Sequence, residues 1–85
     1  MRIDKFLKVS RLIRRRTLAK EVADQGRVEI NGQVVKASAT VKEGDTIAIR
    51  FGQKIVTVHV EMIKNTTKKD EAESMYKIIS EEAVN

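Results

Sequence analysis

The sequence contains no cysteine, and it has no apolar run near the roughly 18 consecutive residues that a membrane-spanning helix needs. Disulfide and thiolate chemistry are therefore excluded, and no membrane association is expected. The N-terminus lacks the apolar segment and the small-residue cleavage site of a secretory signal. We expect a chain that is complete from its initiating methionine and acts in the cytoplasm.

Also lacking is any group of residues that could form an active site. There is no glycine-rich phosphate loop and no cluster with metal-ligand spacing, and the one histidine, His59, falls on the polar side of an expected strand. Asp4 and Asp24 are too isolated in sequence to be argued as a carboxylate pair. The sequence therefore predicts no catalytic residue, no metal site, no cofactor and no enzymatic activity.

Basic residues, by contrast, gather at one end of the chain. The formal net charge is +5, and residues 1–27 carry nine Lys/Arg against three Asp/Glu, a net of +6. Residues 28–64 carry five against four, and residues 65–85 carry three against five. Charge segregated in this way attracts polyanions, so it favours a nucleic-acid partner over a merely solvated face.

Aromatic residues are scarce, which bears on how a nucleic acid would be recognised. Phe6 and Phe51 fall on apolar faces and are interpreted as core residues. Single-strand binders offer exposed rings to bases, whereas structured RNA is recognised mainly through shape, phosphates and 2′-hydroxyls. An arginine surface with few rings favours structured RNA. A DNA-reading helix-turn-helix is an alternative, because the chain opens with two expected helices.

Those two helices occupy the first third. Apolar residues recur at steps of three and four over residues 3–13, which predicts an amphipathic helix. After a basic link at residues 14–16, Thr17 is expected to cap a second helix that ends at Gly26. The residues expected in the core of this region are Phe6, Leu7, Leu12, Leu18 and Val22.

Strands are expected beyond Gly26, where the period of apolar residues changes to two. Asn31-Gly32 is a strong hairpin signal between Val28–Ile30 and a returning strand at residues 34–35. A turn at residues 42–45 precedes expected strands at 46–51 and 54–62.

The last segment differs in composition. Residues 65–69 are polar and predict a connection, and Ala72, Met75, Tyr76 and Ile79 recur at helical spacing. The expected fold class is α+β, with two N-terminal helices packed on a small, mainly antiparallel sheet and a C-terminal helix. Residues 1–64 would form an RNA-binding domain, and residues 65–85 a polar connection and an acidic C-terminal helix.

Three runs of residues carry a family resemblance. They are Arg2-Ile3-Asp4-Lys5-Phe6-Leu7, Arg15-Arg16-Thr17-Leu18-Ala19 and Gln25-Gly26-Arg27-Val28-Glu29-Ile30-Asn31-Gly32. A later Gly44-Asp45 with Ile47 and Ile49 extends the pattern, which covers residues 2–51. In these runs the chain resembles the RNA-binding domain named after ribosomal small-subunit protein four.

The chain as a whole resembles a free-standing bacterial branch of that family, which acts in ribosome-associated quality control and is related to a ribosome-rescuing heat-shock protein. Residues 4–33, 50–60 and 65–76 carry this closer resemblance. It implies binding to a stalled large ribosomal subunit through large-subunit rRNA and P-site peptidyl-tRNA. It also implies that the partner RqcH is assisted in adding a C-terminal alanine tail to the nascent chain. We expect a monomer.

Residue by residue, the resemblance implies RNA contacts for Arg2 and Arg16, and it puts Asp4 at the family's acidic position near the helix start. From the residues alone, Asp4 could either orient Arg16 or cap the helix. The complete set of predicted RNA-binding residues is Arg2, Asp4, Lys5, Lys8, Arg11, Arg14, Arg15, Arg16, Lys20, Arg27 and Asn31. Two further alternatives stay open: a module that recruits an RNA-modifying enzyme, and another structured-RNA-binding factor of ribosome assembly or rescue.

Overall fold

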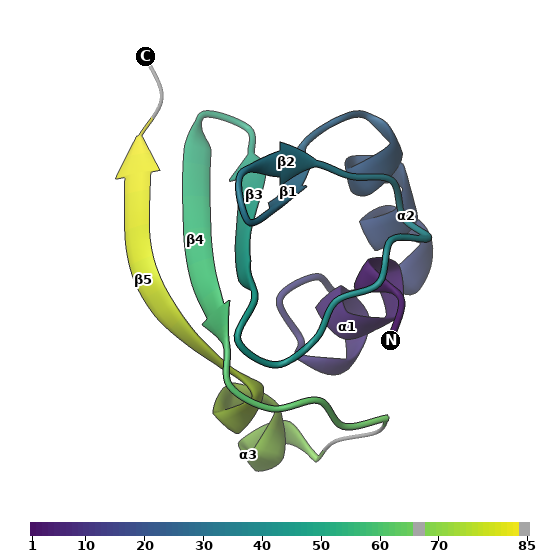
Figure 1. The fold of residues 1–85 in the computed structure, drawn as a ribbon, viewed down its shortest axis with the longest axis vertical. Helices are drawn as coiled ribbons and strands as arrows, with labels where there is room; N and C mark the ends of the chain where they lie inside the picture. Colours follow the sequence, from purple (N-terminus) through teal and green to yellow (C-terminus); the bar gives the residue numbers. More distant parts are fainter. Residues whose placement is uncertain (66–67, 84–85) are drawn as a thin grey trace.

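Two helices form the N-terminal part of the fold. The computed structural model describes residues 1–65 and 68–83. Helices α1 (Ile3–Val9) and α2 (Arg16–Asp24) pack on each other and lie beside a sheet (Figure 1). The predicted α+β class and the pair of N-terminal helices are confirmed. Within the described residues, no helix is long and apolar enough to cross a membrane.

Both helices differ from the prediction at one end. The helix expected over residues 3–13 ends at Val9, because Arg11 takes a left-handed φ of 64° and the Ile13 amide turns back to the Leu7 carbonyl at 3.0 Å. The second helix begins at Arg16 with Arg15 as its N-cap, so the prediction of Thr17 as the cap is wrong. This start is exposed, and water can satisfy the amides of the first turn without a side-chain cap.

All pairings in the sheet are antiparallel. Its strands are β1 (Val28–Ile30), β2 (Gln33–Val34), β3 (Thr46–Phe51), β4 (Lys54–Val60) and β5 (Tyr76–Ala83), arranged in the order β2-β1-β3-β4-β5. The predicted hairpin turn is confirmed: Asn31 and Gly32 have φ of 52° and 85°, the positive values that such a turn requires. The register sets Ile49 between Val28 and Val56, so alternate residues of the central strands face the helices.

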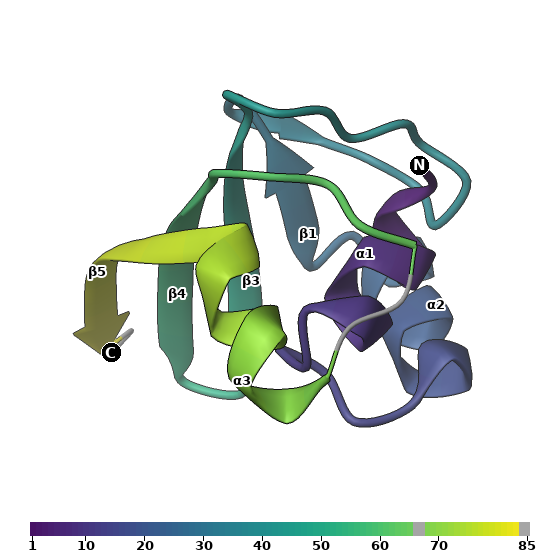
Figure 2. The same cartoon turned by 90° about the horizontal axis from the view of Figure 1, so that it is seen from below.

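The C-terminal segment departs most from the prediction. Of the residues described in this segment, only 69–75 are helical, as α3 (Lys69–Ala72) and a 3-10 turn (Glu73–Met75), and the chain then forms β5 along β4. The predicted C-terminal helix is therefore wrong beyond Met75. Seen from below, α3 lies between the start of β5 and α1 (Figure 2). The expected polar connection includes Thr66 and Thr67, which lie outside the described residues.

The core lies between the two helices and the sheet. Phe6, Leu7 and Val22 are buried there, as predicted, and Leu12 is partly buried. Leu18 was expected in this core, but it is 46% exposed. The packing face of α2 is formed instead by Ala19, Val22 and Ala23, and Leu18 lies at the edge of that face.

Candidate RNA-binding surface

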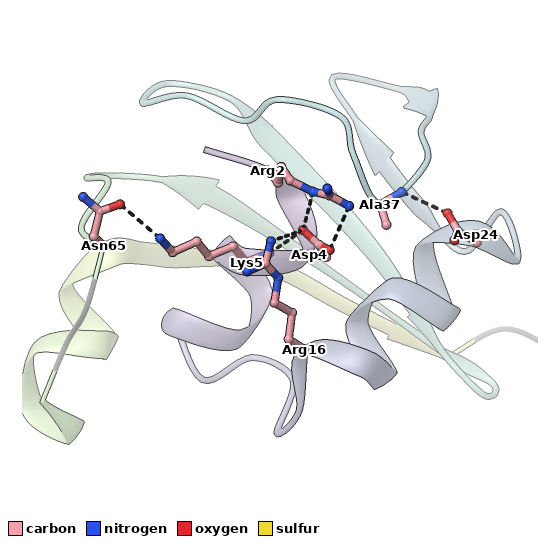
Figure 3. Close-up of polar contacts among 7 residues, drawn as sticks. All are labelled: Arg2, Asp4, Lys5, Arg16, Asp24, Ala37 and Asn65. Atoms are coloured by element: carbon pink, nitrogen blue, oxygen red, sulfur yellow. Dashed lines mark hydrogen bonds and ion pairs between the residues drawn. The ribbon is translucent and has the colours of Figure 1, made fainter.

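Asp4, in the first turn of α1, brings two arginines together. Its Oδ1 accepts hydrogen bonds from the backbone amide of Lys5 at 2.8 Å, from Arg2 Nε at 3.2 Å and from Arg16 Nη2 at 3.5 Å (Figure 3). Its Oδ2 accepts a further bond from Arg2 Nη2 at 3.3 Å. We call Arg2, Asp4 and Arg16 the Asp4 cluster. It joins the residue before α1 to the first residue of α2.

Burial differs sharply within the Asp4 cluster. The Asp4 side chain is 3% exposed, whereas those of Arg2 and Arg16 are 49% and 47% exposed. A buried carboxylate is costly unless it is paired, and here two guanidiniums and an amide pair it. Each guanidinium has five N–H donors, so both arginines can bind the carboxylate and still offer donors to an outside anion. Asp4 therefore acts as a positioning residue.

The chain segment after β2 holds this arrangement in place. The Ile3 amide donates to the Ala39 carbonyl at 2.8 Å, and Arg2 forms an isolated β-bridge with Thr40. Near the end of α2, the Asp24 carboxylate accepts a hydrogen bond from the Ala37 amide at 3.1 Å (Figure 3). One segment thus contacts both the start of α1 and the end of α2, which fixes the backbone beneath Arg2.

Three more predicted residues surround a depression at the end of α1. Lys8, Arg11 and Arg14 line a space of about 360 Å³ together with Leu12 and Ile13. All three basic side chains belong to exposed residues. We call this the basic depression. The cations around it favour an anionic group such as a phosphate.

The remaining basic residues have less uniform surroundings. Lys5 Nζ donates to Asn65 Oδ1 at 3.4 Å, and Arg15 is exposed at the start of α2. Lys20 lines a shallow hollow of about 460 Å³ whose other lining residues include Glu21 and Asp24. Since two carboxylates share its surroundings, Lys20 contributes less to the positive field than the Asp4 cluster or the basic depression.

Arg27 and Asn31 have identifiable local partners. Arg27 is partly buried, and its Nη1 donates to Gln25 Oε1 at 3.3 Å. Asn31 Nδ2 donates to Asp45 Oδ1 at 3.1 Å, and its Oδ1 accepts from the Thr46 amide at 2.9 Å. The Asn31 amide group therefore stabilises the turn and the start of β3.

The three aromatic rings differ in accessibility. Phe6 is fully buried, whereas Phe51 and Tyr76 are only partly buried. Burial, and secondarily the nearby Glu73 carboxylate, raises the pKa of Tyr76 above its usual value, so this phenol stays neutral at physiological pH. Phe51 borders a groove described below, and the interpretation of it as a core residue holds only in part.

The structure places His59 on β4, with Nδ1 3.6 Å from Glu61 Oε2. Among the described residues there is no group of three or more His, Asp or Glu side chains that could hold a metal ion. On the edge of the sheet formed by β4 and β5, Lys54 Nζ lies 3.1 Å from Glu81 Oε1.

Sequence reasoning missed the exposure of Leu18 and did not consider Arg50. Leu18 was assigned to the core, although its helix also offered the small residues Ala19 and Ala23 for packing. Arg50 was not considered, yet it shares a small pocket with Arg27 on the solvent side of β3. The strict alternation with buried Ile49 was the signal that could have identified Arg50 as exposed.

In comparison with protein families, residues 1–47 match the S4 domain. The match spans α1, α2, the hairpin and the start of β3, and so includes the Asp4 cluster and the basic depression.

Curated relatives match nearly the whole chain. The RQC P-site tRNA stabilizing factor of Bacillus subtilis is 68% identical over 82 residues, covering 96% of this chain and 95% of that protein. The protein with the same description from Halalkalibacterium halodurans is 60% identical over 84 residues, covering 99% and 96%. Among solved structures, a trimeric heat shock protein 15 of Vibrio cholerae superposes with a TM-score of 0.86 at 32% identity, covering 94% of this chain and 82% of that one.

Proposed function

Because the chain belongs to the S4-domain family, and within it to the RqcP group of RQC P-site tRNA stabilizing factors, we propose that it binds structured RNA on the ribosome during quality control. Its targets are P-site tRNA and large-subunit rRNA on the stalled subunit. In that position it supports RqcH-dependent alanine tailing of the nascent chain. A ribosomal site of action is cytoplasmic.

The observation that carries this proposal is the Asp4 cluster. Two half-exposed guanidiniums are held in fixed orientation by a buried carboxylate, at the junction of two helices. Guanidinium groups bind phosphate oxygens in a planar, two-pronged manner. Since the carboxylate has already restricted both side chains, less conformational entropy is lost when a phosphate binds.

The mechanism is positioning without catalysis. A phosphate track of one RNA meets the Asp4 cluster, and the basic depression receives another stretch of backbone. Holding rRNA and tRNA on one small rigid surface restricts the tRNA to the geometry that tailing requires. The contacts of the Asp4 cluster and the basic depression are with phosphate and RNA shape, so these two sites can stabilise P-site tRNA whatever its sequence.

Purification of the tagged protein from cells, followed by sequencing of the bound RNA, tests this function. We expect enrichment of large-subunit rRNA and tRNA, loss of that enrichment in an Arg2→Ala/Arg16→Ala variant, and no loss in Lys77→Ala on β5. Recovery of RqcH with the wild type, and loss of alanine tails in the double variant, test the finer steps. Enrichment of DNA, or of a modifying enzyme without ribosomal particles, contradicts the proposal.

We further propose that the protein acts as a single copy, although the Vibrio cholerae structure is of a trimer. The arginines of the Asp4 cluster and the basic residues of the basic depression lie in one continuous region of α1, α2 and the link between them. One chain therefore carries the whole proposed RNA-binding surface. Light scattering of the purified protein checks this, and a trimeric mass contradicts it.

A further inference from the structure

An apolar groove lies between the α1–α2 link, α2 and the turn after β3. It has a volume of about 330 Å³. Its floor and walls are formed by Leu12, Ile13, Leu18, Val22, Phe51 and Gly52, and Arg14 and Arg27 complete the lining. We call it the Leu18 groove.

The Leu18 groove is separate from the Asp4 cluster. The helical period places Leu18 and Val22 on one edge of the buried face of α2, and Arg16 and Lys20 on the other. Leu18 is 46% exposed, although it is a large apolar residue in a chain with a small core. The exposed part of Leu18 and the adjoining apolar lining therefore offer a small apolar surface to a bound group.

The two arginines decide what kind of group the groove accepts. Arg14 is exposed and also lines the basic depression, so the Leu18 groove continues the proposed RNA-binding surface. Arg27 is partly buried at the groove itself. An apolar lining that also includes two arginines is complementary to an apolar ring attached to an anion.

We propose that the Leu18 groove binds one unstacked nucleobase of the RNA, with the flanking phosphates on Arg14 and Arg27. This inference rests on the proposed function and refines it. It requires an RNA with a bulged or looped-out nucleotide beside the RNA helix whose phosphates contact the Asp4 cluster. Unpaired bases are the parts of structured RNA that proteins read, by packing against aromatic or guanidinium planes. Phe51, Leu18 and the two arginines supply such surfaces.

The test compares two RNA hairpins that differ at one nucleotide. One carries a single bulged 2-aminopurine, and the other carries an abasic site at the same position. Affinity is measured by fluorescence anisotropy of an end label at one fixed salt concentration, and burial of the base by the 2-aminopurine emission. We expect the wild-type protein to bind the base-bearing hairpin about tenfold more tightly, the value of one base packed on a protein surface.

Four variants identify the site of that preference. Leu18→Gln should lose most of the preference, whereas Leu18→Met should retain it because the apolar contact persists. Arg16→Ala should weaken binding of both hairpins by the same factor and leave their ratio unchanged. Ile79→Gln, at a residue 55% exposed on β5, is the matched control for an exposed apolar-to-amide change and should alter neither affinity.

The possible results distinguish failure of the nucleobase site from failure of the proposed RNA-binding function. Equal affinity of the wild type for both hairpins, or a preference that survives Leu18→Gln, overturns the nucleobase site and leaves RNA binding intact. In either case an apolar side chain of a protein partner becomes the better occupant of the groove. Failure of the wild type to bind either hairpin argues against the proposed function itself.

Discussion

The buried carboxylate of Asp4 in α1 accepts a hydrogen bond of 3.5 Å from the guanidinium of Arg16, the first residue of α2. This contact joins two helices that are separated by a tight link. It also fixes the direction of an arginine that remains half exposed. The same ion pair therefore serves helix packing and the proposed RNA contact, and the two roles can be separated by experiment.

Asp4→Asn keeps the size of the side chain and removes its charge. We expect the free energy of unfolding to fall by about 1–3 kcal/mol, the value of hydrogen bonds to a charged group. RNA affinity should fall as well, because Arg2 and Arg16 lose their common anchor. The added net positive charge opposes this loss, but salt screens it at physiological ionic strength. Urea denaturation and RNA titration measure the two effects.

Asp70→Asn, at an exposed acidic residue of α3, makes the same charge change away from the cluster and is the control. It should leave both quantities nearly unchanged. Tighter RNA binding by Asp4→Asn than by the wild type would mean that the carboxylate serves packing alone.

Arg16→Ala should weaken RNA binding by about 1–3 kcal/mol, the value of a charge-assisted hydrogen bond. The fold should tolerate the change, because Arg2 and the Lys5 amide still pair the Asp4 carboxylate. Repeating the titration over a range of salt concentrations should give a slope reduced by about one, as expected when one phosphate contact is lost.

Arg16→Lys distinguishes geometry from charge at the same position. Lysine keeps the positive charge but lacks the planar fork, so we expect an affinity between those of the wild type and Arg16→Ala. Lys77→Ala on β5 removes a positive charge elsewhere and should have little effect. Equal affinities for the wild type and Arg16→Ala would exclude Arg16 from the interface.

Replacement of Arg11 by glycine should have opposite effects on stability and on RNA binding. Its φ of 64° is left-handed, a region otherwise occupied in the described chain only by Asn31 and by glycines. This conformation costs a residue with a side chain about 1–2 kcal/mol, and glycine would avoid that strain. Glycine also makes the unfolded chain more flexible, which offsets about 0.4–1 kcal/mol of the gain in stability. Arg11→Gly should therefore raise the free energy of unfolding by up to about 1 kcal/mol while it weakens RNA binding.

Arg14→Gly is the matched control, since Arg14 lines the same depression without a positive φ. It should weaken RNA binding and lower stability. If Arg11→Gly also melted at a lower temperature than the wild type, the strain argument would fail, and the arginine side chain would be contributing to the fold.

Local signals predicted the parts of the fold that local physics determines. The strand expected at residues 46–51 has those bounds, because alternation with buried Ile47 and Ile49 leaves one register open. The turn at Asn31-Gly32 follows from the positive φ that those residues tolerate. The excess of basic residues in the first third of the chain can likewise be counted directly from the sequence.

Features that depend on contacts between distant residues were less predictable. The family resemblance placed Asp4 at an acidic position near the start of the helix, and physical reasoning left orientation of Arg16 and capping of the helix as equal alternatives. The exposure of Leu18 depends on where the link after α1 runs, which the early helix end at Val9 determines. Strand β5 pairs with the edge of β4 that β3 leaves open. The backbone hydrogen bonds and side-chain contacts of that pairing outweigh the helical spacing of residues 72–79.

That last difference gives a prediction about Met75 and Ile79, which the helical spacing had placed on one packing face. In the structure, Met75 is fully buried and Ile79 is exposed on β5. Met75→Ala should lower the free energy of unfolding by about 2–5 kcal/mol, as for a buried methionine elsewhere. Ile79→Ala should cost no more than about 1 kcal/mol, within the range of strand preferences at an exposed site. Urea denaturation of both variants measures the difference.

A helix continuing through Ile79 would make the two costs similar, because both side chains would then pack on the sheet. The pairing can be checked independently of stability: an antiparallel β5 brings Val58 opposite Ile78, and NMR should detect contacts between their backbone protons. Contacts between residues three and four positions apart within 76–83 would instead restore the helix. Because Met75 closes the core and Tyr76 begins the strand, the change from helix to strand falls between two adjacent residues.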